Sequence, residues 1–176
     1  VVAGSFSKTN PDWLAVPGPN CWPGMDAACQ TIQALKQQAD WVLVFLHWSD
    51  EIFPYPHLED RQVARGLLEA GADLIVGHHP HVVRGMETFS GKPVFYSLGN
   101  FYFSDIPDGR GGWINRSAPR NREALGVLVT LRRGESPVCQ PLPFWQAGGQ
   151  TQPDPKRRAE RRLAQMSVPL RQFQDQ

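Results

Sequence analysis

The sequence predicts an α/β fold, because short runs of β-forming residues alternate with segments of helical periodicity. Trp41 to Leu46 is an unbroken apolar run, as in a strand covered on both faces, and Asp73 to Val76 is predicted to be a second buried strand. Between them, residues 58–70 carry apolar side chains on one helical face, and Gly71 offers a C-terminal cap. Such a strand–helix–strand unit is best built as a parallel crossover, so a parallel sheet is expected.

Further elements flank this unit on both sides. Residues 1–6 are predicted to form a strand, residues 10–23 a loop rich in Pro and Gly, and residues 25–39 a helix, since their apolar positions recur at three and four. After the unit, two hairpins are expected, the first within residues 82–98 and the second within residues 126–142. Their turns are Ser90-Gly91-Lys92 and Arg133-Gly134-Glu135, and residues 104–123 between the hairpins are predicted to be a long loop.

The chain is predicted to divide into a main unit, residues 1–150, and a basic C-terminal helical tail, residues 151–176. The expected role of the tail is that of a solvated surface helix, with contact to an anionic surface as the alternative. Among the three cysteines, Cys21 and Cys29 can pair in an oxidising compartment. Free thiols packed as small apolar groups are the favoured interpretation.

Composition fits a globular protein and narrows the classes of partner. The 176 residues are 41% hydrophobic and 20% charged, which excludes a disordered chain. A formal net charge of +1 gives no reason to expect a nucleic-acid partner. No apolar stretch approaches the roughly 18 residues of a membrane-spanning helix. The chain lacks a starting Met and a signal peptide, and it opens on a predicted strand, so we expect it to be cut from something longer.

Four of the five histidines follow the two buried strands. His47 comes directly after Leu46, and His78, His79 and His81 follow the strand that ends at Val76. Parallel strands finish at the same edge of a sheet, which is where open α/β sheets place ligands. Neutral imidazoles bind zinc, iron or manganese-class ions, so a metal site is predicted at this edge. The alternative for His47 alone is a polar residue satisfied at a strand end.

The local backbone selects among these histidines. Pro80 disfavours the helical region for His79 and is expected to hold it extended. Residues two apart in an extended chain face the same way, so His79 and His81 should project together while His78 points elsewhere. Gly77 is expected to permit a sharp exit from the strand.

Three further polar residues are expected near the histidines. Asn100 should return to the same edge at the end of the first hairpin, where it either orients substrate or water or closes a turn after Gly99. Asp50 and Glu51 lie just past His47, where a carboxylate can act as general acid or base, bond to a ligating histidine, or face solvent. His57 precedes the second helix and is expected at the surface.

Three segments in order resemble one known family. Residues 46–51 (LHWSDE) resemble its HWGxE segment, residues 71–82 (GADLIVGHHPHV) its GADLVIGxHPHV segment, and residues 92–101 (KPVFYSLGNF) its GKPIFYSLGNFVF segment. The family is that of the bacterial capsule-synthesis proteins of the CapA type, linked to poly-γ-glutamate biosynthesis, within the calcineurin-like metallophosphoesterase superfamily. The resemblance is tight over residues 41–103 and weak beyond them, including the tail.

The resemblance implies a fold and a site. The chain would be the C-terminal part of a four-layer α/β/β/α metallophosphoesterase-like sandwich with a two-metal centre of the Mn, Fe or Zn class. His47, His79 and His81 fall on metal-binding positions, and Glu51 and Asn100 would position substrate or water. His78 falls on a position that the family leaves variable.

The chain departs from the family in two ways. Ser49 stands where the family has Gly, and Ile52 where it usually has Tyr. These changes leave the ligands alone but can reshape the wall of the pocket. The early GD and NNH motifs, which supply the remaining metal ligands, are absent, so the chain would hold half of an active site and hydrolyse phosphoesters negligibly by itself.

Two functions remain open on the sequence. One is a metal-dependent hydrolase that acts on a phosphoester or an anionic, amide-linked polymer of the capsule pathway. The other is a non-catalytic polymer-binding or scaffolding component of an envelope synthesis complex, because a fold does not settle activity. The family implies the outer face of the cell envelope, reached through an N-terminal anchor that this chain does not contain.

Overall fold

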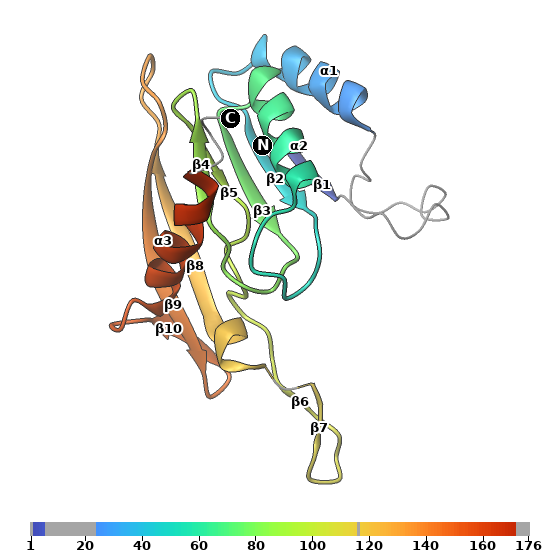
Figure 1. Ribbon diagram of the computed structural model, residues 1–176, viewed down its shortest axis with the longest axis vertical. Coiled ribbons are helices and arrows are strands. Elements are labelled where there is room, and N and C mark those ends of the chain that lie inside the picture. The colour runs from blue at the N-terminus through green and yellow to red at the C-terminus, as the bar shows by residue number, and fades with distance from the viewer. Residues whose placement is uncertain (1, 6–23, 116, 172–176) are drawn as a thin grey trace.

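A computed structural model describes residues 2–5, 24–115 and 117–171. Its main element is a five-stranded sheet with two helices over one face (Figure 1). In spatial order the strands are β1 (Val2–Ser5), β2 (Leu43–His47), β3 (Leu74–His78), β5 (Lys92–Phe95) and β4 (Met86–Phe89).

The centre of this sheet is parallel, as the sequence predicted. β2 pairs with both β1 and β3 in parallel, β5 continues the parallel order beside β3, and β4 closes the edge antiparallel to β5. The register of β2 and β3 sets His47 opposite His78. Both strands therefore end at the same level, which places the segments that follow them side by side.

Helices α1 (Met25–Lys36) and α2 (Leu58–Glu69) cover one face of the sheet. Their buried side chains join those of the strands in one apolar cluster around Ile32, Leu67 and Ile75. Gly71 follows α2 with φ of 124°, a conformation that suits glycine and confirms its predicted place at the end of the helix. The backbone then enters β3 through the amide of Ala72, which bonds to the carbonyl of Leu67.

The second sheet is antiparallel and faces the other side of the molecule (Figure 1). It consists of β8 (Glu123–Thr130), β9 (Val138–Ala147) and β10 (Gln150–Pro153). A second apolar cluster joins the two sheets, with Val76 and Phe95 from the first and Leu125 from the second. The hairpin of β8 and β9 was predicted, whereas β10 was not.

Helix α3 (Arg158–Arg171) packs against β4, β8 and β9, where the two sheets come together. Ala159 and Leu163 enter the cluster between the sheets, and Leu170 reaches the cluster under α1 and α2. The predicted helix is therefore present. Its inner face is part of the core, and only its outer face is solvated.

The turns of the first hairpin and the long loop refine the predictions. Ser90 and Gly91 have φ of 48° and 78°, as in the two-residue turns that match the twist of a hairpin. The segment predicted as loop contains β6 (Ile106–Pro107) and β7 (Trp113–Asn115), which form a small arm projecting from the body, and the 3₁₀ helix η2 (Pro119–Arg122) (Figure 1).

The α/β class predicted from the sequence is confirmed, while the four-layer sandwich and the division at residue 150 stay predictions. The predicted strand at the N-terminus is present as β1. The loop 10–23 and Cys21 lie outside the described residues, and Cys29 and Cys139 are free thiols. Within the described ranges, no helix is both long and apolar enough to cross a membrane.

Candidate metal centre

The candidate site lies where β2 and β3 end at the same edge of the parallel sheet. Two backbone hydrogen bonds join the segments that leave the strands: the amide of Trp48 donates to the carbonyl of His78 (3.1 Å), and the amide of Ile52 donates to the carbonyl of Pro80 (2.8 Å). These bonds hold residues 48–52 against residues 78–81. The sequence predicted this meeting of the two segments, and the structure confirms it.

Glu51, His79 and His81 form a group that fits a metal ion. One ligand atom from each residue lies within 4.8 Å of the other two. Two ligands of one ion lie about 4 Å apart at most, because each metal–ligand bond is about 2.1 Å long. A small side-chain adjustment therefore brings the three atoms onto one ion, and two imidazoles with a carboxylate suit zinc, iron or manganese. In the part of the chain that the structure describes, no other group of three such residues meets this test.

His47 and His78 lie outside this group in different ways. The ring of His47 lies beside that of His79, with centroids 4.5 Å apart. His78 stacks on Phe45 at 6.2 Å and is exposed. The prediction that His78 points away from His79 and His81 is confirmed. His47 adjoins the group without belonging to it.

The backbone prediction for His79 was wrong, although His79 and His81 do project together. His79 has φ of 98° and His81 has φ of 58°, so neither residue is in ordinary extended chain. Proline restrains the residue before it only through local sterics. Here the carbonyl of Pro80 accepts a hydrogen bond from the amide of Ile52, and this contact between the two loops sets the backbone conformation around His79 instead.

Gly77 also differs from its predicted role. It lies inside β3 rather than at an exit from it, and its φ is not positive. A Cβ atom there would lie 2.3 Å from both the Trp48 indole nitrogen and the Tyr96 carbonyl oxygen. The indole donates to that same carbonyl at 3.1 Å. Glycine is needed because the indole crosses directly over the strand.

Partial burial favours neutral imidazoles at this edge. It lowers the pKa of His79 below the usual value, and the nearby Glu51 carboxylate reverses only part of that effect. The pKa of His47 is also lowered, first by desolvation and then by the neighbouring His79. A metal ion binds the neutral ring, so these shifts keep His47 and His79 in the binding form at neutral pH.

Asn100 contacts a histidine of the group directly. Its side-chain oxygen lies 2.7 Å from Nδ1 of His81, and its amide donates to the carbonyl of Asn121 at 3.3 Å. A carboxamide oxygen only accepts, so His81 carries its proton on Nδ1 and keeps the lone pair of Nε2 free for a ligand. The return of Asn100 to this edge was predicted from the hairpin. Its predicted role toward substrate or water stays a prediction.

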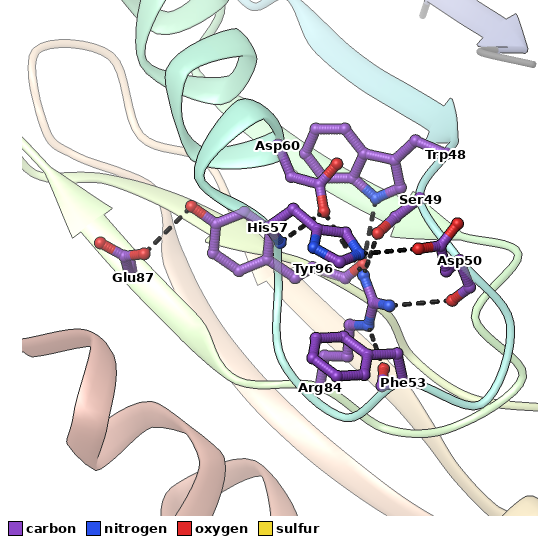
Figure 2. Close-up of polar contacts among 9 residues, drawn as sticks. All are labelled: Trp48, Ser49, Asp50, Phe53, His57, Asp60, Arg84, Glu87 and Tyr96. Atoms are coloured by element: carbon purple, nitrogen blue, oxygen red, sulfur yellow. Dashed lines mark hydrogen bonds and ion pairs between the residues drawn. The ribbon is translucent and has the colours of Figure 1, made fainter. Parts of the chain in front are cut away.

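Asp50 is not a member of the group. Its carboxylate lies 2.9 Å from Nε2 of His57, and the His57 ring stacks on Phe53 at 5.0 Å (Figure 2). The backbone amide of His57 donates to Asp60 at 2.9 Å, which caps α2. His57 is thus partly exposed at the start of a helix, close to its predicted surface position.

Sequence reasoning missed Arg84, a fully buried residue beneath the loop that carries Glu51. Its guanidinium donates to Ser49, Asp50 and Phe53 (Figure 2). One signal in the sequence points to it: a charged residue directly follows the apolar pair Val82-Val83. A buried arginine needs several partners, but the sequence does not say which ones.

The fold and the site together define an α/β protein with a histidine–carboxylate group at the carboxyl edge of a parallel sheet. The chain belongs to the family described as bacterial capsule synthesis protein PGA_cap, whose sequence pattern it matches over residues 7–105. This match covers the candidate site, and it confirms the resemblance in the three motifs.

Curated relatives agree with this assignment. The PGA biosynthesis protein CapA of Bacillus subtilis (strain 168) is 50% identical over 102 residues, which are 58% of this chain and 24% of the relative. The capsule biosynthesis protein CapA of Bacillus anthracis is 34% identical over 109 residues, or 62% of this chain and 24% of the relative. A probable polyglutamine synthesis accessory protein of Mycobacterium tuberculosis (strain CDC 1551 / Oshkosh) is 33% identical over 87 residues, 49% of this chain and 22% of the relative. The chain spans about a quarter of the length of these relatives.

Proposed function

We propose that the chain carries part of a metal-dependent hydrolase that acts in the synthesis or processing of a capsule polymer of the poly-γ-glutamate type. The observation that carries this proposal is the convergence of Glu51, His79 and His81 at the sheet edge. The names of the relatives support the pathway. They also support a place at the cell envelope. A synthesis complex there, and an anchor elsewhere in the whole protein, are further parts of the proposal.

In this proposal Glu51, His79 and His81 hold a divalent ion of the Mn, Fe or Zn class, and a second ion completes the site of the whole protein. A bound ion supplies positive charge that polarises a substrate oxygen and lowers the pKa of water. The sequence assigned Glu51 to substrate or water and His47 to the metal. The geometry favours Glu51 as a ligand and sets His47 beside His79, where it can complete the ligand set or face the substrate.

Asn100 has a defined part in this arrangement. By accepting the Nδ1 proton of His81, it presents Nε2 of that ring as an unprotonated donor. The neutral state of His79 is favoured by its burial. In this proposal the chain offers two imidazole nitrogens and one carboxylate to the ion.

A metal titration of the purified chain tests the proposal. We expect His79→Ala and Glu51→Gln each to weaken the binding of Mn²⁺, measured by calorimetry, by at least about 10-fold. His78→Ala is the matched control, since that neighbouring histidine stacks on Phe45 outside the group. Equal affinity in all four proteins, or no binding by the unaltered chain, would contradict the proposed site.

A second candidate function is non-catalytic binding of the polymer. Exposed aromatic side chains flank the histidines on two segments, and His81 contacts the ring of Phe103 at 5.2 Å. These side chains are Phe53, Tyr55, Phe101, Tyr102 and Phe103. If binding alone is the function, poly-γ-glutamate should bind equally well with and without EDTA, and Phe101→Ala with Tyr102→Ala should weaken it. Metal-dependent turnover by the full-length protein would exclude this candidate.

A further inference from the structure

Arg84 is a charged residue that is buried in the protein. Burial of a charge is tolerated only where hydrogen bonds and an opposite charge compensate for the lost water. The residue is 0% exposed, and it follows the buried residues Val82 and Val83. Removing a guanidinium from water is costly unless its donors are all engaged. The partners of Arg84 therefore indicate what its burial achieves.

The three hydrogen bonds that the guanidinium makes with the described residues go to one short segment. Nε donates to the carbonyl of Phe53 at 2.8 Å, one terminal nitrogen donates to Oγ of Ser49 at 2.6 Å, and the other donates to the carbonyl of Asp50 at 2.9 Å. The carboxylate of Asp60, in the first turn of α2, lies 3.5 Å away and balances the charge. Figure 2 shows the guanidinium among these partners.

The segment that Arg84 holds has an unfavourable backbone conformation. Ser49 and Ile52 have φ of 70° and 64°, and a β-branched residue rarely adopts such a value. Strained residues of this kind persist only where the surroundings determine them. The Arg84 guanidinium forms hydrogen bonds to the segment on both sides of Glu51, at residues 49, 50 and 53. The amide of Ile52 donates to the carbonyl of Pro80.

We infer that Arg84 is a positioning residue that sets the affinity of the candidate metal centre by holding the Glu51 loop against His79 and His81. This inference rests on the proposed function, because it needs a metal to bind there. Arg84 does not touch the metal in this arrangement. It acts through the backbone that carries Glu51, as outer-shell partners of metal ligands do.

Two substitutions of Arg84 separate the effect of its positive charge from that of its planar set of hydrogen-bond donors. Arg84→Lys keeps the charge but cannot donate to three acceptors in one plane, and Arg84→Met removes the charge as well. We expect both to weaken Co²⁺ binding by about 10- to 100-fold, the usual effect of losing an outer-shell partner. The visible absorption of the Co²⁺-loaded chain should also change, because a displaced Glu51 alters the ligand set.

Arg61→Met is the matched control. Arg61 is a second largely buried arginine, and it pairs with Glu87 at 2.6 and 2.8 Å, away from the Glu51 loop. Its loss should lower thermal stability, yet leave the Co²⁺ affinity and spectrum of the folded chain unchanged. If Arg61→Met weakens Co²⁺ binding as much as the Arg84 variants do, the effect is general destabilisation and the inference fails.

Ser49→Ala provides a test that does not depend on the folding of the Arg84 variants. It removes one acceptor of the guanidinium, and we expect a weaker loss of affinity of a few-fold with the same direction of spectral change. An affinity equal to that of the unaltered chain would overturn the positioning role. If the unaltered chain binds Co²⁺ but Glu51→Gln binds it equally, the assignment of Glu51 fails. If the unaltered chain does not bind Co²⁺, the proposed function itself fails.

Discussion

Single side chains influence the protonation of the histidines at this edge, which the proposed metal binding requires to be neutral. Asn100 selects the tautomer of His81, and burial disfavours the charged form of His79. Neither effect needs the metal, so both are properties of the fold. If the proposed metal site is right, the fold favours the metal-binding protonation state of these two rings before any ion binds.

Substitution of Asn100 tests this preorganisation. Asn100→Ala removes the acceptor for Nδ1 of His81, so the ring is free to rotate and to change tautomer. We expect Mn²⁺ affinity to fall about 10-fold or more, with little change in the melting temperature of the metal-free chain. Asn100→Asp retains an acceptor and should bind the ion at least as well as Asn100→Ala does. The opposite order of the two variants would be inconsistent with a role through His81.

Gly77 allows close packing at the same edge of the sheet, because it leaves room for the Trp48 indole. In Gly77→Ala the added methyl group would meet the Trp48 indole and the backbone of Tyr96, neither of which can move freely. We expect a loss of about 1–3 kcal/mol or more in the free energy of unfolding, measured by urea denaturation. Gly126→Ala in β8 is the control, because its Cβ would meet a side chain, Phe144, at 3.1 Å rather than backbone. Equal losses in both variants would show that the close crossing of Trp48 is not the cause.

Residue-level features are where prediction from the sequence was least complete. The structure groups His79 and His81 without His78, but not by the extended backbone that the sequence argument assumed, and the choice of these two as metal ligands stays a prediction. The left-handed conformations of His79 and Ile52 depend on contacts between loops about thirty residues apart, which local rules do not contain. The same holds for Arg84, whose guanidinium donates to Ser49, Asp50 and Phe53, residues distant from it in the sequence.

At the scale of elements, the parallel unit and both hairpins could be predicted because their patterns are local. Strand β10 could not, because Gln150 to Pro153 has no apolar alternation and pairs only through its neighbour β9. The two strands of the small arm are short, and they lack such a signal as well. Helix α3 was predicted, but its packing between the sheets depends on which of its faces meets β4, β8 and β9.

Helix α3 begins at a buried carboxylate that makes its attachment dependent on pH. The side chain of Asp154 accepts from the backbone amides of Lys156 (3.0 Å) and Arg158 (2.8 Å) and pairs with the Arg158 guanidinium. Burial alone would raise the pKa of Asp154, but the hydrogen bonds from these amides and the charge of Arg158 lower it overall. The carboxylate therefore stabilises the fold above its unfolded-state pKa of about 3.9, and this contribution is lost as pH falls through the folded-state pKa.

Asp154→Ala should accordingly lower the free energy of unfolding by about 0.5–2 kcal/mol at pH 7, as expected for a lost cap. The difference from the unaltered chain should shrink as the pH falls below about 3.9. Urea denaturation at a series of pH values measures both effects. Glu160→Gln, which breaks an exposed pair with Arg157 in the first turn of α3, should change little at any pH. If the loss in unfolding free energy caused by Asp154→Ala is the same at pH 7 and pH 2.5, the ionised carboxylate is not the source of that loss.

For the whole molecule, the number of metal ligands limits the chemistry that we expect. Among residues 2–5, 24–115 and 117–171, one three-ligand group fits an ion, whereas a two-metal mechanism stabilises the attacking and leaving oxygens with two. We therefore expect the 176-residue chain to bind one equivalent of Mn²⁺ and to hydrolyse a chromogenic phosphoester negligibly. The full-length protein should be faster by orders of magnitude in the same assay. Robust Mn²⁺-dependent turnover by the 176 residues would overturn this expectation.

The four non-glycine residues with positive φ at the site, Ser49, Ile52, His79 and His81, also bear on how the family can vary. Each such residue strains the backbone by roughly 1–3 kcal/mol, and glycine would relieve much of that strain. A laboratory evolution experiment that selects only for heat resistance should therefore enrich glycine at these positions, beginning with Ser49. Selection for metal-dependent function should retain the two histidines, and the difference between the two outcomes would locate the site by genetics alone.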